Sequence, residues 1–168
     1  MKIEIVVACD EKFGIGKNGQ LLWQLPDDMK FFKQITLGHP VIMGKNTYQS
    51  IPQQFRPLPG RKNLVISRTL KKTHDEIEIF DDIDKCLRFC QRLQFEKVMV
   101  IGGGLIYQQF MEKNLVDTIY FTLVHAIFDA DTFFPYFNRQ KWNPERLHYH
   151  AKDQKHNYDF TFFRFDKK

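Results

Sequence analysis

Three short, largely apolar runs, each followed by a turn of small or polar residues, constrain what this chain can fold into more than any other feature. They lie at residues 41–43, 63–66 and 98–101. A fourth run, at residues 3–8, begins by alternating and then becomes continuously apolar, which is typical of a strand buried on both faces of a sheet. We therefore expect an α/β fold in which residues 3–8 form a central strand.

The turns after the three later runs are each suited to an anion. Residues 44–47 bring backbone N–H groups, a lysine and a hydroxyl to the start of a short helix, and residues 67–69 place two hydroxyls around a guanidinium. The glycines at 102–104 let the backbone approach a ligand closely before a helix at 105–112. Taken singly, the first turn could simply cap a helix, the second could be a surface turn, and the glycines could form a hinge. Together, at the carboxyl ends of strands, they predict a site for one dinucleotide with a diphosphate and a further ribose phosphate.

Two details refine this dinucleotide prediction. Lys45 and Arg68 bring positive charge to the turns and therefore favour a phosphorylated ribose. The usual Rossmann fingerprint is absent, because Tyr107 stands where its last glycine would be and no acid about 20 residues later ends a strand.

The segment from Pro26 to Ile35 is expected to be helical, because proline suits the first turn of a helix. Helical spacing then places Asp28 on the apolar face that carries Phe31, Phe32 and Ile35. A carboxylate removed from water is costly unless a basic residue of the protein or a ligand binds it. The alternative is a first-turn acid that the helix dipole favours and that remains hydrated. Residues 9–24, which precede this helix, read as a long loop of the kind that often carries function.

Length and composition favour one domain spanning residues 1–168. Of the 168 residues 43% are hydrophobic, and no Pro/Gly/Ser-rich linker or charged block divides them. We expect neither a signal peptide nor a membrane span, because no segment approaches about 20 apolar residues. The three cysteines, an odd number, argue against a disulfide framework and for the cytoplasm. The net charge of +5 is spread along the chain, which argues against a nucleic-acid-binding stripe.

The second half of the chain offers two weak metal-site patterns. Cys86 and Cys90 are spaced i, i+4 on an amphipathic helix at residues 83–93, but no further cysteine or histidine lies nearby, so we expect a thiol pair in or near the core. Residues 146–150 and 158–165 alternate as the arms of an antiparallel hairpin would. His148 and His150 share one face of it, but with no third ligand we expect exposed edge residues and no metal.

Blocks that span almost the whole chain resemble motifs of dihydrofolate reductase, in that family's order. They are residues 14–16 (GIG), 21–28 (LLWQLPDD), 41–48 (VIMGKNTY), 50–51 (SI), 57–63 (PLPGRKN), 67–68 (SR), 101–107 (IGGGLIY) and 131–135 (DTFFP). Because so many blocks agree, the resemblance favours a ligand as the partner of Asp28.

The resemblance implies a fold and a reaction. The fold is an eight-stranded, mostly parallel sheet with an antiparallel last strand and flanking helices. The reaction is the reduction of 7,8-dihydrofolate to 5,6,7,8-tetrahydrofolate by NADPH, with hydride transfer to C6 and protonation at N5. The imine accepts hydride readily only when N5 is protonated, and Asp28 is the one evident ionisable group for that region. The resemblance further implies a monomer that binds antifolate inhibitors and needs neither nucleic acid nor a membrane.

The same resemblance assigns residues to the site. Asp28 would bind the pterin, Trp23 would order a water near it, Thr122 would support that network, and Arg61 would fork onto the glutamate carboxylate. The other implied substrate contacts are Val6, Ala8, Phe32, Ser50, Ile51, Leu58, Ile101 and Tyr107. The implied cofactor contacts are Ala8, Ile15, Gly19, Gln20, Gly44, Lys45, Asn46, Thr47, Ser67, Arg68, Gly103, Gly104, Leu105, Ile106, Tyr107 and Gln109. The Gly102–Gly103 peptide bond is expected to be cis, as in the family.

Three departures from the family pattern stand out. Leu22 replaces the usual proline before the tryptophan, residues 53–55 look like a small insertion beside Arg61, and Lys45-Asn46 replaces a more usual basic pair. Three other functions remain to be separated by experiment. They are a pyrimidine reductase of riboflavin synthesis, which should lack the 23–28 block and the Arg61 turn, a non-catalytic nucleotide-binding module, and a nucleic-acid binder.

Overall fold

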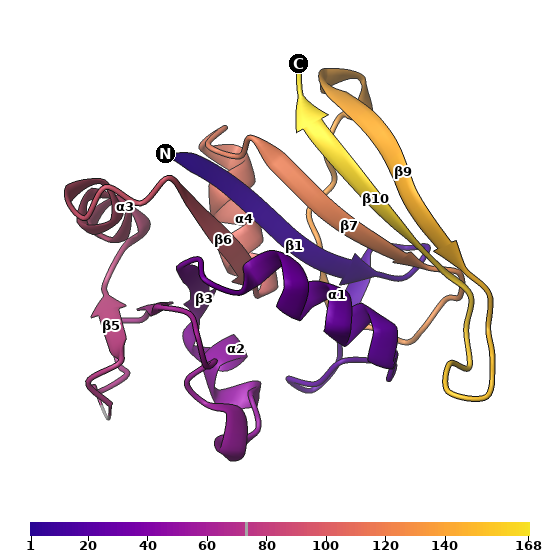
Figure 1. Cartoon of the computed structure of the whole chain (residues 1–168), viewed down its shortest axis with the longest axis horizontal. Helices are drawn as coiled ribbons and strands as arrows, with labels where there is room; N and C mark the ends of the chain where they lie inside the picture. Colours follow the sequence, from indigo (N-terminus) through magenta and orange to yellow (C-terminus); the bar gives the residue numbers. More distant parts are fainter. Residues whose placement is uncertain (73) are drawn as a thin grey trace.

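The structure is a computed structural model that describes residues 1–72 and 74–168, and its main feature is an eight-stranded sheet (Figure 1). The strand order is β5-β4-β3-β6-β1-β7-β10-β9. The strands are β1 (Lys2–Cys9), β3 (Val41–Gly44), β4 (Asn63–Ile66), β5 (Ile77–Phe80), β6 (Lys97–Gly102), β7 (Thr118–Val124), β9 (Trp142–His150) and β10 (Phe160–Lys167). Neighbours from β5 to β7 pair in parallel, whereas β10 is antiparallel to β7 and β9. The expected α/β fold with an antiparallel last strand is therefore confirmed.

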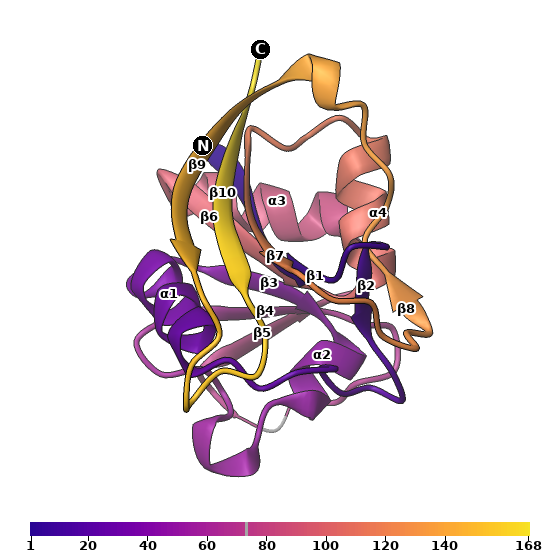
Figure 2. The ribbon, with the colours of Figure 1, turned by 90° about the vertical axis from the view of Figure 1, so that its right-hand side faces the viewer.

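Helices cover both faces of this sheet. They are α1 (Pro26–Thr36), α2 (Lys45–Ser50), α3 (Ile83–Arg92) and α4 (Gly104–Glu112), with short 3-10 turns at Gln53–Phe55 and Arg139–Lys141. Figure 2 shows α1 on one face of the sheet and α3 and α4 on the other. Proline begins α1 and the side chain of Asp82 caps α3, accepting a hydrogen bond of 2.7 Å from the Lys85 amide.

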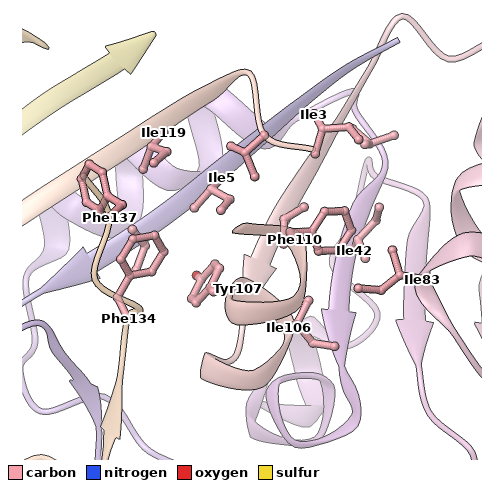
Figure 3. Close-up of a cluster of buried hydrophobic side chains, with 14 of the residues drawn as sticks. Ile3, Ile5, Ile42, Ile83, Ile106, Tyr107, Phe110, Ile119, Phe134 and Phe137 are labelled. Atoms are coloured by element: carbon pink, nitrogen blue, oxygen red, sulfur yellow. The ribbon is translucent and has the colours of Figure 1, made fainter. Parts of the chain in front are cut away.

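The central strand β1 is buried on both faces, as its sequence predicts. Ile3, Ile5 and Val7 join a core cluster with α3 and α4, whereas Val6 belongs to a second cluster and Ala8 packs against a third. Figure 3 shows the first cluster, where α4 packs over the strands. Since successive side chains of a strand point to opposite faces, the even-numbered residues of β1 lie on the α1 face.

Some predicted boundaries were wrong. The loop at residues 9–24 contains a short strand, β2 (Gly14–Gly16), which pairs with β8 (Thr132–Phe133). Strand β9 begins at Trp142 rather than 146, strand β10 begins at Phe160 rather than 158, and β5 was not anticipated. These strands are short or irregular, and their hydrogen bonds to distant strands, which no local pattern reveals, define them.

The remaining sequence expectations concern membranes and cysteines. Among the described residues, no helix has the length and apolar character required to cross a bilayer. Cys9, Cys86 and Cys90 are free thiols and all three are buried.

Candidate active site

The three anion-suited turns lie together at one edge of the sheet. Strands β4, β3 and β6 are neighbours and run in parallel, so their carboxyl ends meet there. A cavity of about 880 Å³ opens at this edge. Most of the predicted cofactor contacts line it, namely Ile15, Gly19, Gln20, Gly44, Lys45, Asn46, Thr47, Ser67, Arg68, Gly103, Gly104, Leu105, Ile106 and Gln109. Ser50 and Ile101, which were assigned to the substrate, line it as well.

Ala8 and Tyr107 do not line this cavity. Tyr107 is buried, and its hydroxyl donates a hydrogen bond of 2.6 Å to the carbonyl of Val6. Burial, with smaller contributions from Cys9 and Asp28, raises the pKa of the Tyr107 hydroxyl well above its usual value. Tyr107 therefore remains a hydrogen-bond donor that ties α4 to β1.

The glycine turn between β6 and α4 is closely packed. The Gly102–Gly103 peptide bond is cis, as expected. Gly102 has a φ of 128°, and a Cβ atom there would lie 3.3 Å from Oγ1 of Thr47 and 3.4 Å from the Tyr107 hydroxyl oxygen. The backbone thus forms the cavity wall directly, and the first amides of the nine-residue helix α4 lie at that wall.

Positive and negative side chains both surround the outer part of the cavity. Lys45 Nζ donates a hydrogen bond of 2.9 Å to Thr69 Oγ1, which joins the turns after β3 and β4, while Arg68 is exposed. Sequence reasoning missed Asp81 and Asp82, which also line the cavity. A fourth strand, β5, ends just before them and runs parallel to β4, so recognising it as a strand could have placed them at the same edge.

Asp28 lies on the α1 face of the sheet, opposite β7. Its Oδ1 accepts a hydrogen bond of 2.7 Å from Thr122 Oγ1, and Thr122 pairs in register with Ala8 of β1. Burial raises the pKa of Asp28 to about 6, although the Thr122 hydrogen bond opposes that shift. No cation of the described chain contributes to the shift, so the alternative in which a basic residue of the protein pairs with this carboxylate is not supported.

Trp23 presents a buried donor without an acceptor among the described residues. Its side chain is packed against Phe128, with ring centroids 5.4 Å apart. Its Nε1–H is buried and finds no acceptor among the described residues. Such a donor is rare in native proteins and indicates water or a ligand as its partner.

An apolar wall continues from Asp28 along the same face. Phe32, Ile51, Leu58 and Ile101 all pack against the cluster that contains Val6. These four predicted substrate contacts therefore share one apolar cluster with Val6, although they come from separate segments of the chain, whereas Ala8 and Tyr107 belong to other clusters.

Arg61 lies at the far end of α1. Its Nε donates to the carbonyl of Pro59 at 3.0 Å, its Nη1 donates to Thr36 Oγ1 at 3.0 Å, and its guanidinium lies over the Phe32 ring. Burial lowers its pKa, and no carboxylate of the described chain contributes to that shift. Two of its five N–H donors are used in these bonds, so donors remain for an anionic ligand.

The loop at residues 9–24 is held against residues 126–133. Asp10 is buried and accepts hydrogen bonds from the amides of Lys12, Gly14 and Phe128. The Asn18 amide donates to Asp131 at 2.9 Å. Because Ile15, Gly19 and Gln20 of this loop line the cavity, its position controls the shape of the cavity.

The chain is similar to known reductases over its whole length. A family model described as dihydrofolate reductase matches residues 2–167. A dihydrofolate reductase of Haemophilus influenzae is 37% identical over 168 residues, 100% of both chains. One of Bacillus subtilis is 34% identical, covering 99% of this chain and 95% of its own. A bifunctional dihydrofolate reductase-thymidylate synthase of Daucus carota is 35% identical over 95% of this chain and 33% of its own. The chain belongs to the dihydrofolate reductase family.

Proposed function

We propose that this chain, as a single reductase domain, reduces 7,8-dihydrofolate to 5,6,7,8-tetrahydrofolate with NADPH as the hydride donor. The observation that carries the proposal is Asp28, a half-buried carboxylate whose hydrogen-bond partner among the described residues is the Thr122 hydroxyl. An uncompensated carboxylate is costly to bury, and ligand N–H groups would offset that cost. Its second oxygen accepts no hydrogen bond from the described residues and can accept one from such donors.

The roles of the residues around the pterin follow from their chemistry. Asp28 accepts hydrogen bonds from N3 and the 2-amino group, a charge-assisted pair that orients the ring. Trp23 Nε1–H, which has no acceptor in the described chain, holds a water near N5. With its pKa raised to about 6, Asp28 favours N5 protonation through that water near neutral pH.

The cavity at the strand ends is suited to NADPH, which supplies the hydride. At Gly102 and Gly103 a Cβ atom would lie only 3.3 Å from Thr47 Oγ1, and the first turn of α4 directs free amides to the same wall. Lys45 and Arg68 add positive charge for the ribose phosphate. Arg61 would bind the glutamate carboxylate through its remaining donors, with Phe32 and Leu58 against the aminobenzoyl ring.

The direct test is NADPH oxidation with and without dihydrofolate. We expect oxidation only when dihydrofolate is present, and competitive inhibition by a diaminopyrimidine antifolate that pairs with the same carboxylate. Oxidation that requires the pyrimidine substrate of riboflavin synthesis would favour that reductase instead, and tight NADPH binding without turnover would favour a binding module. Light scattering of the same sample tests the expected monomer.

A further inference from the structure

A group of histidine and aspartate side chains lies outside the proposed active site, at the start of α1. The sequence offered His148 and His150 as a pair without a third ligand. The fold brings Asp27 and His156 to His150, so that one ligand atom from each of these three residues lies within 4.8 Å of the others. His148 is exposed and stands outside this group.

Hydrogen bonds determine which nitrogen of each imidazole carries a proton. His150 Nδ1 is 2.7 Å from the carbonyl of Ala151, and His156 Nδ1 is 2.8 Å from Asp153 Oδ1. Both oxygens only accept, so both Nδ1 atoms are donors. The Nε2 atom of each ring therefore carries the lone pair that could bind a metal ion. Metal-binding histidines have this same arrangement, in which a carbonyl or carboxylate holds the other ring N–H.

Both Nε2 atoms face the carboxylate of Asp27. His150 Nε2 is 3.0 Å from Oδ2, and His156 Nε2 is 3.9 Å from Oδ1. Ligand atoms around a tetrahedral zinc ion, at bonds of about 2.0 to 2.2 Å, are separated by about 3.3 Å, which falls between these distances. A lone pair and a carboxylate oxygen 3.0 Å apart repel each other unless a proton or a metal cation lies between them.

We propose that His150 Nε2, His156 Nε2 and the Asp27 carboxylate bind a divalent transition-metal ion, for which zinc is the probe. Two imidazoles and one carboxylate are ligands that suit zinc, with water in the fourth position. The His156 side chain is only 2% exposed and that of Asp27 is 49% exposed, so the site is rigid on one side and open to solvent on the other. Binding must displace the hydrogen bond that the Asp27 amide donates to His156 Nε2 at 3.1 Å.

The proposed ion would join two parts of the chain that are distant in sequence. Asp27 belongs to the first turn of α1, whereas His150 ends β9 and His156 lies in the connection to β10. A bound ion is therefore expected to stabilise the folded chain, because these ligands are far apart in the unfolded chain.

The test is a titration of the full chain, without a histidine tag, with zinc alone. Calorimetry and competition with a chromophoric chelator should give one zinc per chain, and saturating zinc should raise the thermal unfolding midpoint by several degrees. Cobalt should give the visible absorption of a four-coordinate site at the same stoichiometry. The absence of saturable one-to-one binding would overturn the proposal. The short contact between His150 and Asp27 would then be an ordinary hydrogen-bonded pair with a proton between them.

Variants identify the ligands. His150 is partly exposed and Asp27 is largely exposed, and His150→Gln and Asp27→Asn should each weaken zinc binding about a hundredfold or more. Asp153→Asn should weaken it about tenfold, because the Asp153 carboxylate holds His156 Nδ1 and also lies 3.6 Å from His150 Nε2. His148→Gln is the matched control, since it removes a neighbouring histidine of the same strand, and should leave zinc affinity unchanged. Unchanged affinity in His150→Gln, or an equal loss in His148→Gln, would place zinc elsewhere and contradict the proposal.

Discussion

Asp28 and the Trp23 Nε1–H, on the α1 face, lack a full set of partners in the described chain, and the proposed substrate and its water would supply them. Asp28 has a hydroxyl for a partner but no cation, and Trp23 Nε1–H has no acceptor. Interiors rarely leave such groups unsatisfied. At the scale of single residues, the site is therefore recognisable by what its side chains lack.

Asp28→Asn should keep the shape of the site and remove its charge. We expect dihydrofolate turnover to fall by about a hundredfold or more at neutral pH, because acid-base roles contribute about 10² to 10⁴ in rate. Turnover should recover partly in acid, where solvent protonates N5, and NADPH binding should persist. Steady-state rates across pH and NADPH titration measure both effects. Near-normal turnover at neutral pH would contradict the assigned role.

Arg68→Ala should weaken NADPH binding about tenfold or more and leave NADH binding nearly unchanged. The reason is that a hydrogen bond to a charged group contributes about 1.5 to 3 kcal/mol, and only NADPH carries the ribose phosphate. Titration with each cofactor measures the difference. Lys71→Ala is the control, because it removes an exposed charge from the same segment without altering the cavity lining. An equal loss of both cofactors would show that Arg68 holds the diphosphate or the fold instead.

Among the elements, the loop at residues 9–24 connects the central strand to the helix that carries Asp28. It is anchored at Asp10 and at β2, while its second half lines the cavity. Leu22 lies in that second half, and its amide makes no backbone hydrogen bond among those described. Loops that line a ligand cavity commonly gate ligand exchange.

Leu22→Pro should restrict the open conformations of this loop without removing a hydrogen bond. We expect altered product release or cofactor affinity and little change in the free energy of unfolding. Steady-state turnover compared with single-turnover hydride transfer separates release from chemistry. Identical kinetics in the two proteins would count against a gating role.

At the scale of the whole molecule, burying Asp28 makes the stability of the ligand-free chain depend on pH. The folded pKa is about 6, above the usual value of 3.8, so the folded state binds more protons between these values. The stabilising effect of the protonated form is complete below about pH 4 and is lost as pH rises through about 6. At neutral pH a shift of this size lowers the free energy of unfolding by roughly 2 to 3 kcal/mol relative to its value below pH 4.

Asp28→Asn should therefore be more stable than the parent chain at pH 7 and about equal to it at pH 4. Urea unfolding at a series of pH values, with a chelator present, measures the difference. Stability curves that run parallel at every pH would show that the Asp28 carboxylate is paired or hydrated in the folded chain.

The sequence by itself determined the strands formed by the apolar runs, the helix that begins at Pro26, the glycine turn, and Asp28 as a carboxylate on an apolar face. Each depends on neighbours a few residues away, through side-chain periodicity or the backbone preferences of proline and glycine. The resemblance to a family added the roles of residues such as Arg61 and Trp23, which local patterns leave undefined.

Only the tertiary structure decided which distant groups meet. Thr122 reaches Asp28 across 94 residues because β7 pairs with β1 in a register that places Thr122 on the α1 face. His156 meets the Asp27 amide across 129 residues because the connection between β9 and β10 folds back onto α1. Sheet register and loop docking maximise burial and hydrogen bonding over the whole chain, so no window of sequence contains the information that sets them.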